Sequence, residues 1–134
     1  MPNLILIRGL PGSGKSTFAK KFESYYIEAD MYFMRNGEYK FAVEELGLAH
    51  AWCEEHTLNS LKHGMDVVVS NTFSMQWELN PYLAMPYTKL YISHCTERYQ
   101  NTHNVPADVI AKMETRWEAV KGEDLVYKMG NSYD

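Results

Sequence analysis

The stretch GLPGSGKST, residues 9–17, combines glycine spacing with a Lys-Ser pair in the way that phosphate-binding loops do. It matches the pattern G-x-x-x-x-G-K-[ST] without a mismatch. In such a loop, successive backbone N–H groups surround a phosphate and the following helix adds the positive end of its dipole. Glycines let the backbone approach the phosphate closely because they carry no Cβ. The stretch predicts a nucleotide-binding site that comprises Gly9, Pro11, Gly12, Ser13, Gly14, Lys15, Ser16 and Thr17.

Two side chains of this loop are expected to contact the phosphates and the metal ion. Lys15 should reach the β- and γ-phosphates, and the Ser16 hydroxyl should be a ligand of a nucleotide-bound Mg²⁺. No Thr-Lys-x-Asp guanine signature is present, so ATP is the expected nucleotide. The segment DVVVSN ends in Ser70 and Asn71 where many P-loop hydrolases have an acidic metal-binding residue, which argues against a motor or a GTPase.

Polar residues follow two further expected strands. Asp30 lies fifteen residues after Lys15, where it could accept the proton of an attacking hydroxyl or simply cap a turn. Asn71 and Thr72 could position the phosphates or a Mg²⁺-bound water, and they could equally be ordinary helix caps. The residue types alone leave both alternatives open.

The elements that must position these residues alternate between strands and helices. Residues 3–8 form a nearly continuous Leu/Ile run, typical of a strand buried on both faces, whereas apolar residues recur at helical spacing along residues 43–62. Residues 31–42, with Asn36-Gly37, are expected to form a loop. Strands are predicted at 3–8, 25–27, 66–70 and 89–93, and helices at 16–23, 43–62, 76–84 and from Pro106 on, with Val109, Ile110, Met113, Trp117 and Val120 as the apolar face of the last. This order predicts an α/β fold with a parallel sheet, whose ligands bind beyond the carboxyl ends of the strands.

Composition narrows the class of protein. A chain of 134 residues with 46% hydrophobic and 22% charged residues is expected to form a single globular domain, residues 1–134. The net charge of −4 offers no overall attraction for nucleic acid. Cys53 and Cys95 form no metal-binding pair and are expected to be reduced and buried. The apolar run 4–7 is too short for a signal peptide or a membrane span, so a cytoplasmic protein without membrane association is expected.

Four segments together resemble the small P-loop kinases similar to the phage polynucleotide 5′-hydroxyl kinase domain: LIRGLPGSGKSTFAKKF, EADMYFMRNGEYKF, VVVSNTFSMQWEL and NTHNVPADVIAKMETRWE. The resemblance implies a three-layer P-loop fold with a small lid at about residues 94–106, and Asp30 as the general base. Family members usually have a lid arginine where this chain has Gln100, so Arg98 is the candidate to stabilise the transferring phosphate. His103 is a candidate phosphate contact.

The acceptor side departs from the family. Where the polynucleotide kinase has an arginine for the substrate phosphate this chain has Phe33, and Arg35 is the nearest replacement. The aromatic residues around it could stack a base or could pack the core. Both Phe33 and the net charge argue against tight binding of long polynucleotides.

The leading hypothesis is an ATP- and Mg²⁺-dependent kinase that transfers the γ-phosphoryl group to a hydroxyl, the 5′-hydroxyl of a nucleic acid, nucleotide or nucleoside. The alternative is an ATP-binding regulatory or interaction module with weak or no transfer. The predicted catalytic residues are Lys15, Asp30 and Arg98, and the predicted acceptor contacts are Arg35, Asn71, Thr72 and His103.

Overall fold

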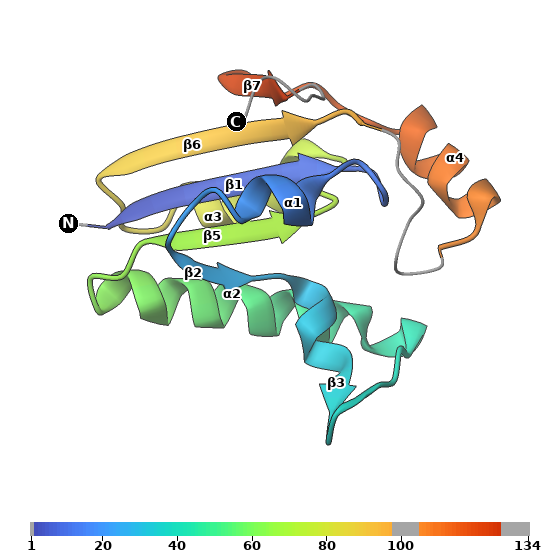
Figure 1. The fold of residues 1–134 in the computed structure, drawn as a ribbon, viewed down its shortest axis with the longest axis horizontal. Helices are drawn as coiled ribbons and strands as arrows, with labels where there is room; N and C mark the ends of the chain where they lie inside the picture. Colours follow the sequence, from blue (N-terminus) through green and yellow to red (C-terminus); the bar gives the residue numbers. More distant parts are fainter. Residues whose placement is uncertain (1, 98–104, 127–134) are drawn as a thin grey trace.

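The structure, a computed structural model, describes residues 2–97 and 105–126. Its centre is a five-stranded, all-parallel sheet in the order β2-β5-β1-β6-β7 (Figure 1). The strands are β1 (Asn3–Gly9), β2 (Tyr25–Ile27), β5 (Val67–Asn71), β6 (Lys89–Cys95) and β7 (Glu123–Val126). The predicted α/β class with a parallel sheet is confirmed.

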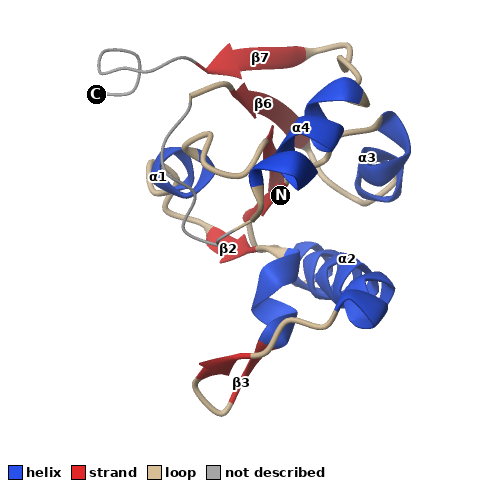
Figure 2. Ribbon diagram, turned by 90° about the vertical axis from the view of Figure 1, so that its right-hand side faces the viewer, coloured by secondary structure: helices blue, strands red, loops and turns tan. Residues whose placement is uncertain are grey.

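Helices cover both faces of the sheet and make three layers. Figure 2 shows α1 on one side of the strands and α2 and α3 on the other. The helices are α1 (Lys15–Ala19), α2 (Leu46–Lys62), α3 (Gln76–Leu83) and α4 (Ala107–Thr115), with 3₁₀ turns η1 (Ala29–Phe33) and η2 (Val43–Glu45). Alternate residues of β1 serve the two layers, since Leu4 and Leu6 pack with the α2 and α3 side whereas Ile5 and Ile7 pack with Ala19 of α1. Burial on both faces explains why β1 is apolar in sequence.

The first helix is shorter than predicted. Residues 16–23 were expected to be helical, but α1 ends at Ala19. Beyond it the chain tightens, because Lys21 N donates to Phe18 O and Phe22 N donates to Ala19 O, both at 3.1 Å. These i→i+3 bonds are typical of a helix end. Phe18 and Phe22 still meet edge to face with ring centroids 5.5 Å apart, so the predicted apolar face survives the shortening.

The last helix is also shorter, and the strand that follows was not predicted. The helix α4 ends at Thr115, so Trp117 and Val120 do not lie on its apolar face as expected. The chain instead turns onto the sheet, where Glu118 N donates to Ser74 O at 2.8 Å and Val120 is buried. The strand β7 then pairs with β6. Its first two residues, Glu and Asp, are poor strand formers, so local sequence gave no sign of it.

A small antiparallel hairpin replaces the loop that was expected between β2 and α2. The strands β3 (Met34–Arg35) and β4 (Glu38–Tyr39) are joined by Asn36 and Gly37, whose φ angles are 53° and 80°. Two positive φ angles are the requirement of a type I′ turn, which Asn-Gly favours. The hairpin projects away from the five-stranded sheet (Figure 1).

Cys53 and Cys95 are buried and form no disulfide, as expected. Within residues 2–97 and 105–126, no helix is both long and apolar enough to cross a membrane.

Candidate functional site

The glycine loop joins β1 to α1 at the carboxyl edge of the sheet. Gly12 and Gly14 have φ angles of 82° and 93°, a region that disfavours residues with a Cβ. A Cβ on Gly9 would lie 2.2 Å from Ser13 Oγ and 2.8 Å from Cys95 O, so only glycine fits there. Ser13 N donates to Leu10 O at 3.0 Å and closes the turn. The loop therefore has the backbone that the sequence pattern predicts.

Lys15 is held inside this loop. Its Nζ donates to Gly9 O at 2.9 Å and to Leu10 O at 3.1 Å. Burial lowers the pKa of Lys15 to about 8, although Cys95, Glu28 and Asp30 act in the opposite direction. Phosphate oxygens would replace the carbonyls as partners and stabilise the charged form of the amine.

This pKa predicts how nucleotide binding depends on pH. Below about pH 8 the amine is already charged, so Lys15 should leave the affinity for MgATP independent of pH. Above that pH, binding must be accompanied by proton uptake, because the phosphates raise the pKa of Lys15. The affinity should then fall by up to about tenfold per pH unit. Equilibrium titration from about pH 7 to about pH 10 tests this, with Lys15→Arg as the control because arginine stays charged over that range. A parent protein whose affinity is constant over the range would contradict it.

Asp30 lies in the first turn of η1, directly after β2. The hydroxyl of Tyr39 donates to its Oδ1 at 2.9 Å, which ties the carboxylate to the hairpin. Desolvation and the neighbouring Asp30 carboxylate raise the pKa of Tyr39 to about 12, so the phenol stays protonated and remains a donor. The Asp30 and Glu28 carboxylates oppose the effect of burial on the pKa of Lys15, because their negative charge favours the protonated amine. Lys15 follows the loop after β1 and Asp30 follows β2, and both strands run parallel to β5, so the two sequence-predicted residues lie at the same edge of the sheet.

Asn71 fastens η1 to the end of β5. Its Oδ1 accepts from Ala29 N at 2.8 Å, and its Nδ2 lies 3.7 Å from Cys53 Sγ in α2. The side chain is buried, so both ends of the carboxamide have partners within the protein. These contacts support a role in positioning Asp30, the residue after Ala29, rather than a direct contact with acceptor. Thr72, the other predicted residue here, accepts from Gly9 N at 3.2 Å through its backbone carbonyl.

Replacing Asn71 by Leu should disturb the position of Asp30. The Ala29 N–H would lose its acceptor in a buried place, at a cost of about 1–3 kcal/mol in the free energy of unfolding. We expect turnover to fall while the affinity for MgATP stays unchanged, because the loop is untouched. Chemical unfolding and steady-state kinetics measure the two effects, with Asn80→Leu on the exposed side of α3 as the matched control. Equal effects of the two substitutions would refute the positioning role.

The remaining predicted site residues divide into two groups. Arg35 lies on β3, where its Nη2 contacts Glu45 Oε1 at 2.7 Å and its guanidinium lies 5.2 Å above the ring of Tyr32. Arg98 and His103, together with most of the predicted lid, lie outside the described residues. Their roles stay predictions from the sequence.

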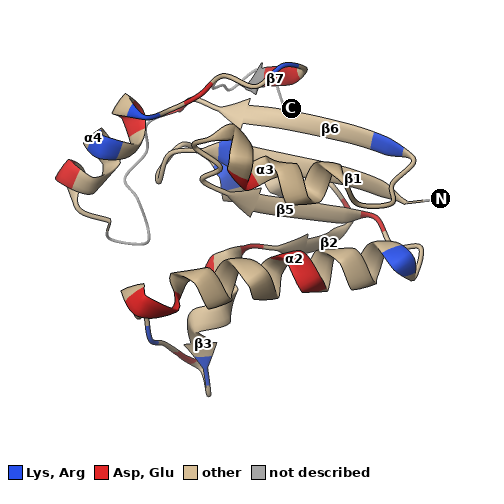
Figure 3. Ribbon diagram, turned by 180° about the vertical axis from the view of Figure 1, so that it is seen from behind, with Lys and Arg blue, Asp and Glu red and all other residues tan. Residues whose placement is uncertain are grey.

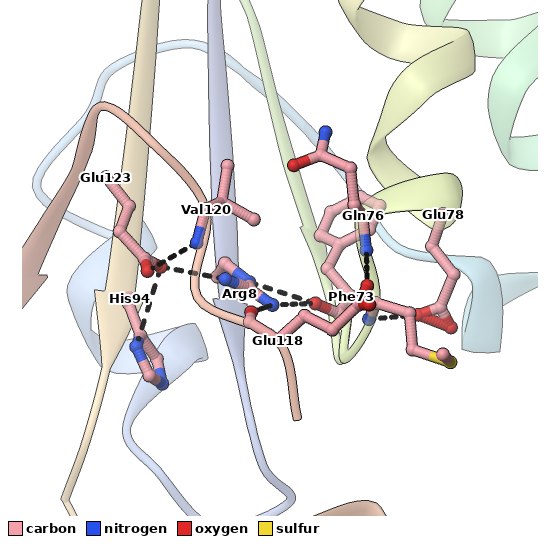
Figure 4. A network of polar contacts seen from close by, with 9 residues as sticks. Arg8, Phe73, Gln76, Glu78, His94, Glu118, Val120 and Glu123 are labelled. Carbon is pink, nitrogen blue, oxygen red and sulfur yellow. Dashed lines mark hydrogen bonds and ion pairs between the residues drawn. The ribbon is translucent and has the colours of Figure 1, made fainter. Parts of the chain in front are cut away.

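A buried arginine for which the sequence predicted no role stabilises the carboxyl edge of the sheet. Arg8 of β1 is wholly buried; its Nε and Nη2 donate to Phe73 O at 2.9 and 2.6 Å, and Nη2 donates to Glu118 O at 2.7 Å (Figure 4). Its Nη1 pairs with Glu123 Oε1 at 2.8 Å. The guanidinium thus joins β1 to the loop after β5 and to the segment before β7. The signal in the sequence was a charge directly after an apolar strand core.

Aromatic rings complete this network. The guanidinium of Arg8 lies 4.3 Å from the ring centroid of Trp117, which in turn stacks on His94 at 4.6 Å. His94 Nδ1 lies 3.5 Å from Glu123 Oε1. Burial lowers the pKa of His94, and the Arg8 charge lowers it further, whereas Glu123 opposes them. The network anchors the segment that was wrongly predicted to continue the last helix.

The residues of the site suit a metal ion that arrives with the nucleotide. Among the described residues, no group of three or more His, Cys, Asp or Glu side chains could hold a metal. Mg²⁺ usually keeps several waters and is bound through substrate phosphates with one or two protein oxygens. Ser16, an exposed residue in the first turn of α1 beside Lys15, offers a hydroxyl oxygen of this kind. The donor set is therefore compatible with nucleotide-borne Mg²⁺.

The fold and the glycine loop define a P-loop protein with a kinase-like fold. Residues 4–95 match the family model AAA_33, described as an AAA domain, and the chain belongs to this family. A segment of 88 residues, 61% of this chain, is 36% identical to NEDD4-binding protein 2 of Homo sapiens. That segment spans only 5% of the human protein.

Two solved structures share the fold. A sugar kinase from Janibacter sp. HTCC2649 superposes with a TM-score of 0.69 at 15% identity, over 96% of this chain and 85% of the kinase. The Pnkp1/Rnl/Hen1 complex contains a chain that superposes with a TM-score of 0.58 at 21% identity, over 83% of this chain and 38% of that one. At such identities the likeness is one of fold, and the fold implies nucleotide binding.

Proposed function

We propose that this protein is an ATP- and Mg²⁺-dependent phosphotransferase that moves the γ-phosphoryl group of ATP to a hydroxyl. The acceptor hydroxyl is the 5′-hydroxyl of a nucleic acid, nucleotide or nucleoside. The observation that carries the proposal is that the half-buried Lys15 and an oriented Asp30 lie beyond the carboxyl ends of parallel strands, at one edge of the sheet. The Tyr39 hydroxyl orients the Asp30 carboxylate and Asn71 holds the backbone of the preceding residue, which suits a group that accepts a proton in a fixed geometry.

Each residue has a defined part in the reaction. The loop amides and Lys15 bind the β- and γ-phosphates, and Ser16 holds the metal. Mg²⁺ supplies positive charge to the phosphates when bound. Asp30 accepts the proton of the acceptor hydroxyl as its oxygen bonds to the γ-phosphorus, and the bond from that phosphorus to the β-phosphate oxygen breaks to release ADP.

Two residues outside the described part of the chain join the proposal on the sequence resemblance alone. Arg98 stabilises the negative charge that develops on the transferring phosphoryl group, and His103 contacts a phosphate. Arg35 could reach an acceptor phosphate only by leaving Glu45, its partner at 2.7 Å.

The test is transfer of label from γ-labelled ATP, with Mg²⁺, to a panel of 5′-hydroxyl oligonucleotides, nucleotides and nucleosides. We expect label on at least one of these classes, and none when Mg²⁺ is chelated. ATP binding without label on any acceptor would overturn the proposal and favour a nucleotide-binding regulatory module.

A further inference from the structure

We propose that the acceptor of this site is a nucleoside-type compound that carries no phosphate, and that it stacks on the exposed side of the β3–β4 hairpin. The inference rests on the proposed function and narrows its acceptor class. It follows from three features of the hairpin: an exposed aromatic surface, its bond to Asp30, and its charge.

Two aromatic rings and a methionine make an exposed apolar surface here. Tyr39 is 45% exposed, Phe41 is 53% exposed and Met34 is 51% exposed. Met34 pairs with Tyr39 across the hairpin, and the rings of Tyr39 and Phe41 both contact Phe33, so the exposed apolar groups are gathered in one place, as at ligand-binding sites. We call these three residues the hairpin surface.

A buried ring holds the hairpin surface in place. Phe33 is 1% exposed and contacts both neighbours, with ring centroids 6.2 Å from Tyr39 at 75° and 5.1 Å from Phe41 at 60°. Lys40 N donates to Phe33 O at 2.8 Å and joins the backbone of the two segments. A nucleobase that stacked on these rings would meet a preformed surface, so binding would lose little conformational entropy through ordering of the hairpin side chains.

The hairpin surface is connected directly to Asp30, the proposed general base. The hydroxyl of Tyr39 donates to Asp30 Oδ1 at 2.9 Å, so the Tyr39 side chain is in direct contact with the carboxylate. A flat group stacked beside that ring would carry an attached hydroxyl toward Asp30. The sugar of a nucleoside provides such a hydroxyl next to a flat base.

The charge around the hairpin disfavours a phosphate on the acceptor. Residues 28–45 contain five carboxylates and two basic side chains, a formal charge of −3. The end of β2 and the turn that opens α2 both carry acidic residues (Figure 3). Both cations already contact carboxylates, since Arg35 lies 2.7 Å from Glu45 and Lys40 lies 3.7 Å from Glu38. A phosphate would meet this negative field without a ready partner, and like charges across an interface oppose binding.

The first test compares the binding of each nucleoside with that of its 3′-monophosphate, because both expose the same 5′-hydroxyl. Binding to the intact chain is measured at equilibrium with a non-hydrolysable ATP analogue present. We expect the nucleoside to bind about tenfold more tightly. Phe41→Ala should weaken nucleoside binding by about tenfold, the scale of one base–aromatic stack, whereas Tyr91→Ala, at an exposed ring on β6, should not.

The second test changes the charge and leaves the rings intact. Glu44→Lys should narrow the preference for nucleoside over 3′-monophosphate by at least about threefold, and Glu55→Lys, an exposed position farther along α2, should leave it unchanged. Retained binding of the ATP analogue confirms that each variant is folded.

The outcomes separate this inference from the proposed function. Tighter or equal binding of the 3′-monophosphate, no binding of either compound, or equal effects of Phe41→Ala and Tyr91→Ala would overturn the inference, even if label transfer occurs. Nucleoside binding that depends on Phe41, without any transfer of label, would sustain the inference about the ligand and refute the kinase.

Discussion

Replacing Asp30 by Asn is expected to lower the rate of phosphoryl transfer by about 10²–10⁴-fold, the contribution of a positioned general base. Asparagine has the same shape, and its carbonyl oxygen can still accept from the Tyr39 hydroxyl at the position of Oδ1. It cannot take a proton from the acceptor. The affinity for MgATP should be unchanged or slightly higher, since a negative charge near the phosphates is lost.

Initial rates at saturating MgATP, together with a nucleotide titration, measure both quantities. Asp124→Asn, at an exposed position on β7, is the matched control and should transfer at the parental rate. A variant Asp30→Asn that retains full transfer would show that another group takes the proton. A variant that loses nucleotide binding would show that Asp30 supports the loop rather than the chemistry.

Replacing Arg8 by Met is expected to lower the free energy of unfolding by about 3–5 kcal/mol, the usual cost of removing one partner from a buried ion pair. Glu123, whose side chain is 9% exposed, would keep a carboxylate without the Arg8 guanidinium. The carbonyls of Phe73 and Glu118 would also lose a donor. Because a domain is stable by only about 5–15 kcal/mol, the change is a large share of the total.

Urea unfolding measures this effect, with Arg116→Met at an exposed position as the control. The double substitution Arg8→Met with Glu123→Leu should recover part of the loss, because no buried charge is then left alone. A loss below about 1 kcal/mol for Arg8→Met would mean that the network contributes little to stability.

The phosphate loop and the central strands could be predicted because their determinants are local. An apolar run specifies β1, and the positions of Gly12 and Gly14 specify a backbone that other residues avoid. The end of β2 likewise follows from three β-prone residues before Asp30. In each case the residues that decide the structure are neighbours in sequence.

The structure of residues 107–126 was predicted poorly because it depends on contacts with residues that are distant in the sequence. The helical spacing of Val109, Ile110 and Met113 continues to Trp117 and Val120, but Trp117 packs on Arg8, more than a hundred residues earlier. Tertiary contacts with β1 and β6 therefore outweigh the local helical pattern. The pairing of β7 with β6 has the same origin.

The candidate site depends on both local and distant determinants. Sequence placed Asp30 and Asn71 at the same edge, but the bond from Ala29 N to Asn71 Oδ1 joins residues 42 positions apart and has no local signal. The aromatic residues after β2 were equally compatible with stacking and with packing. The structure divides them, since Phe33 is buried while Tyr39 and Phe41 are exposed.

Phosphoryl transfer by this protein is tested most directly by following the γ-phosphoryl group when the parent chain reacts with labelled MgATP in the presence of nucleosides. We expect label to appear on an acceptor hydroxyl faster than it appears as inorganic phosphate, and Asp30→Asn to abolish only the first product. Label released solely as inorganic phosphate, at a rate that neither acceptors nor Asp30→Asn change, would contradict this expectation.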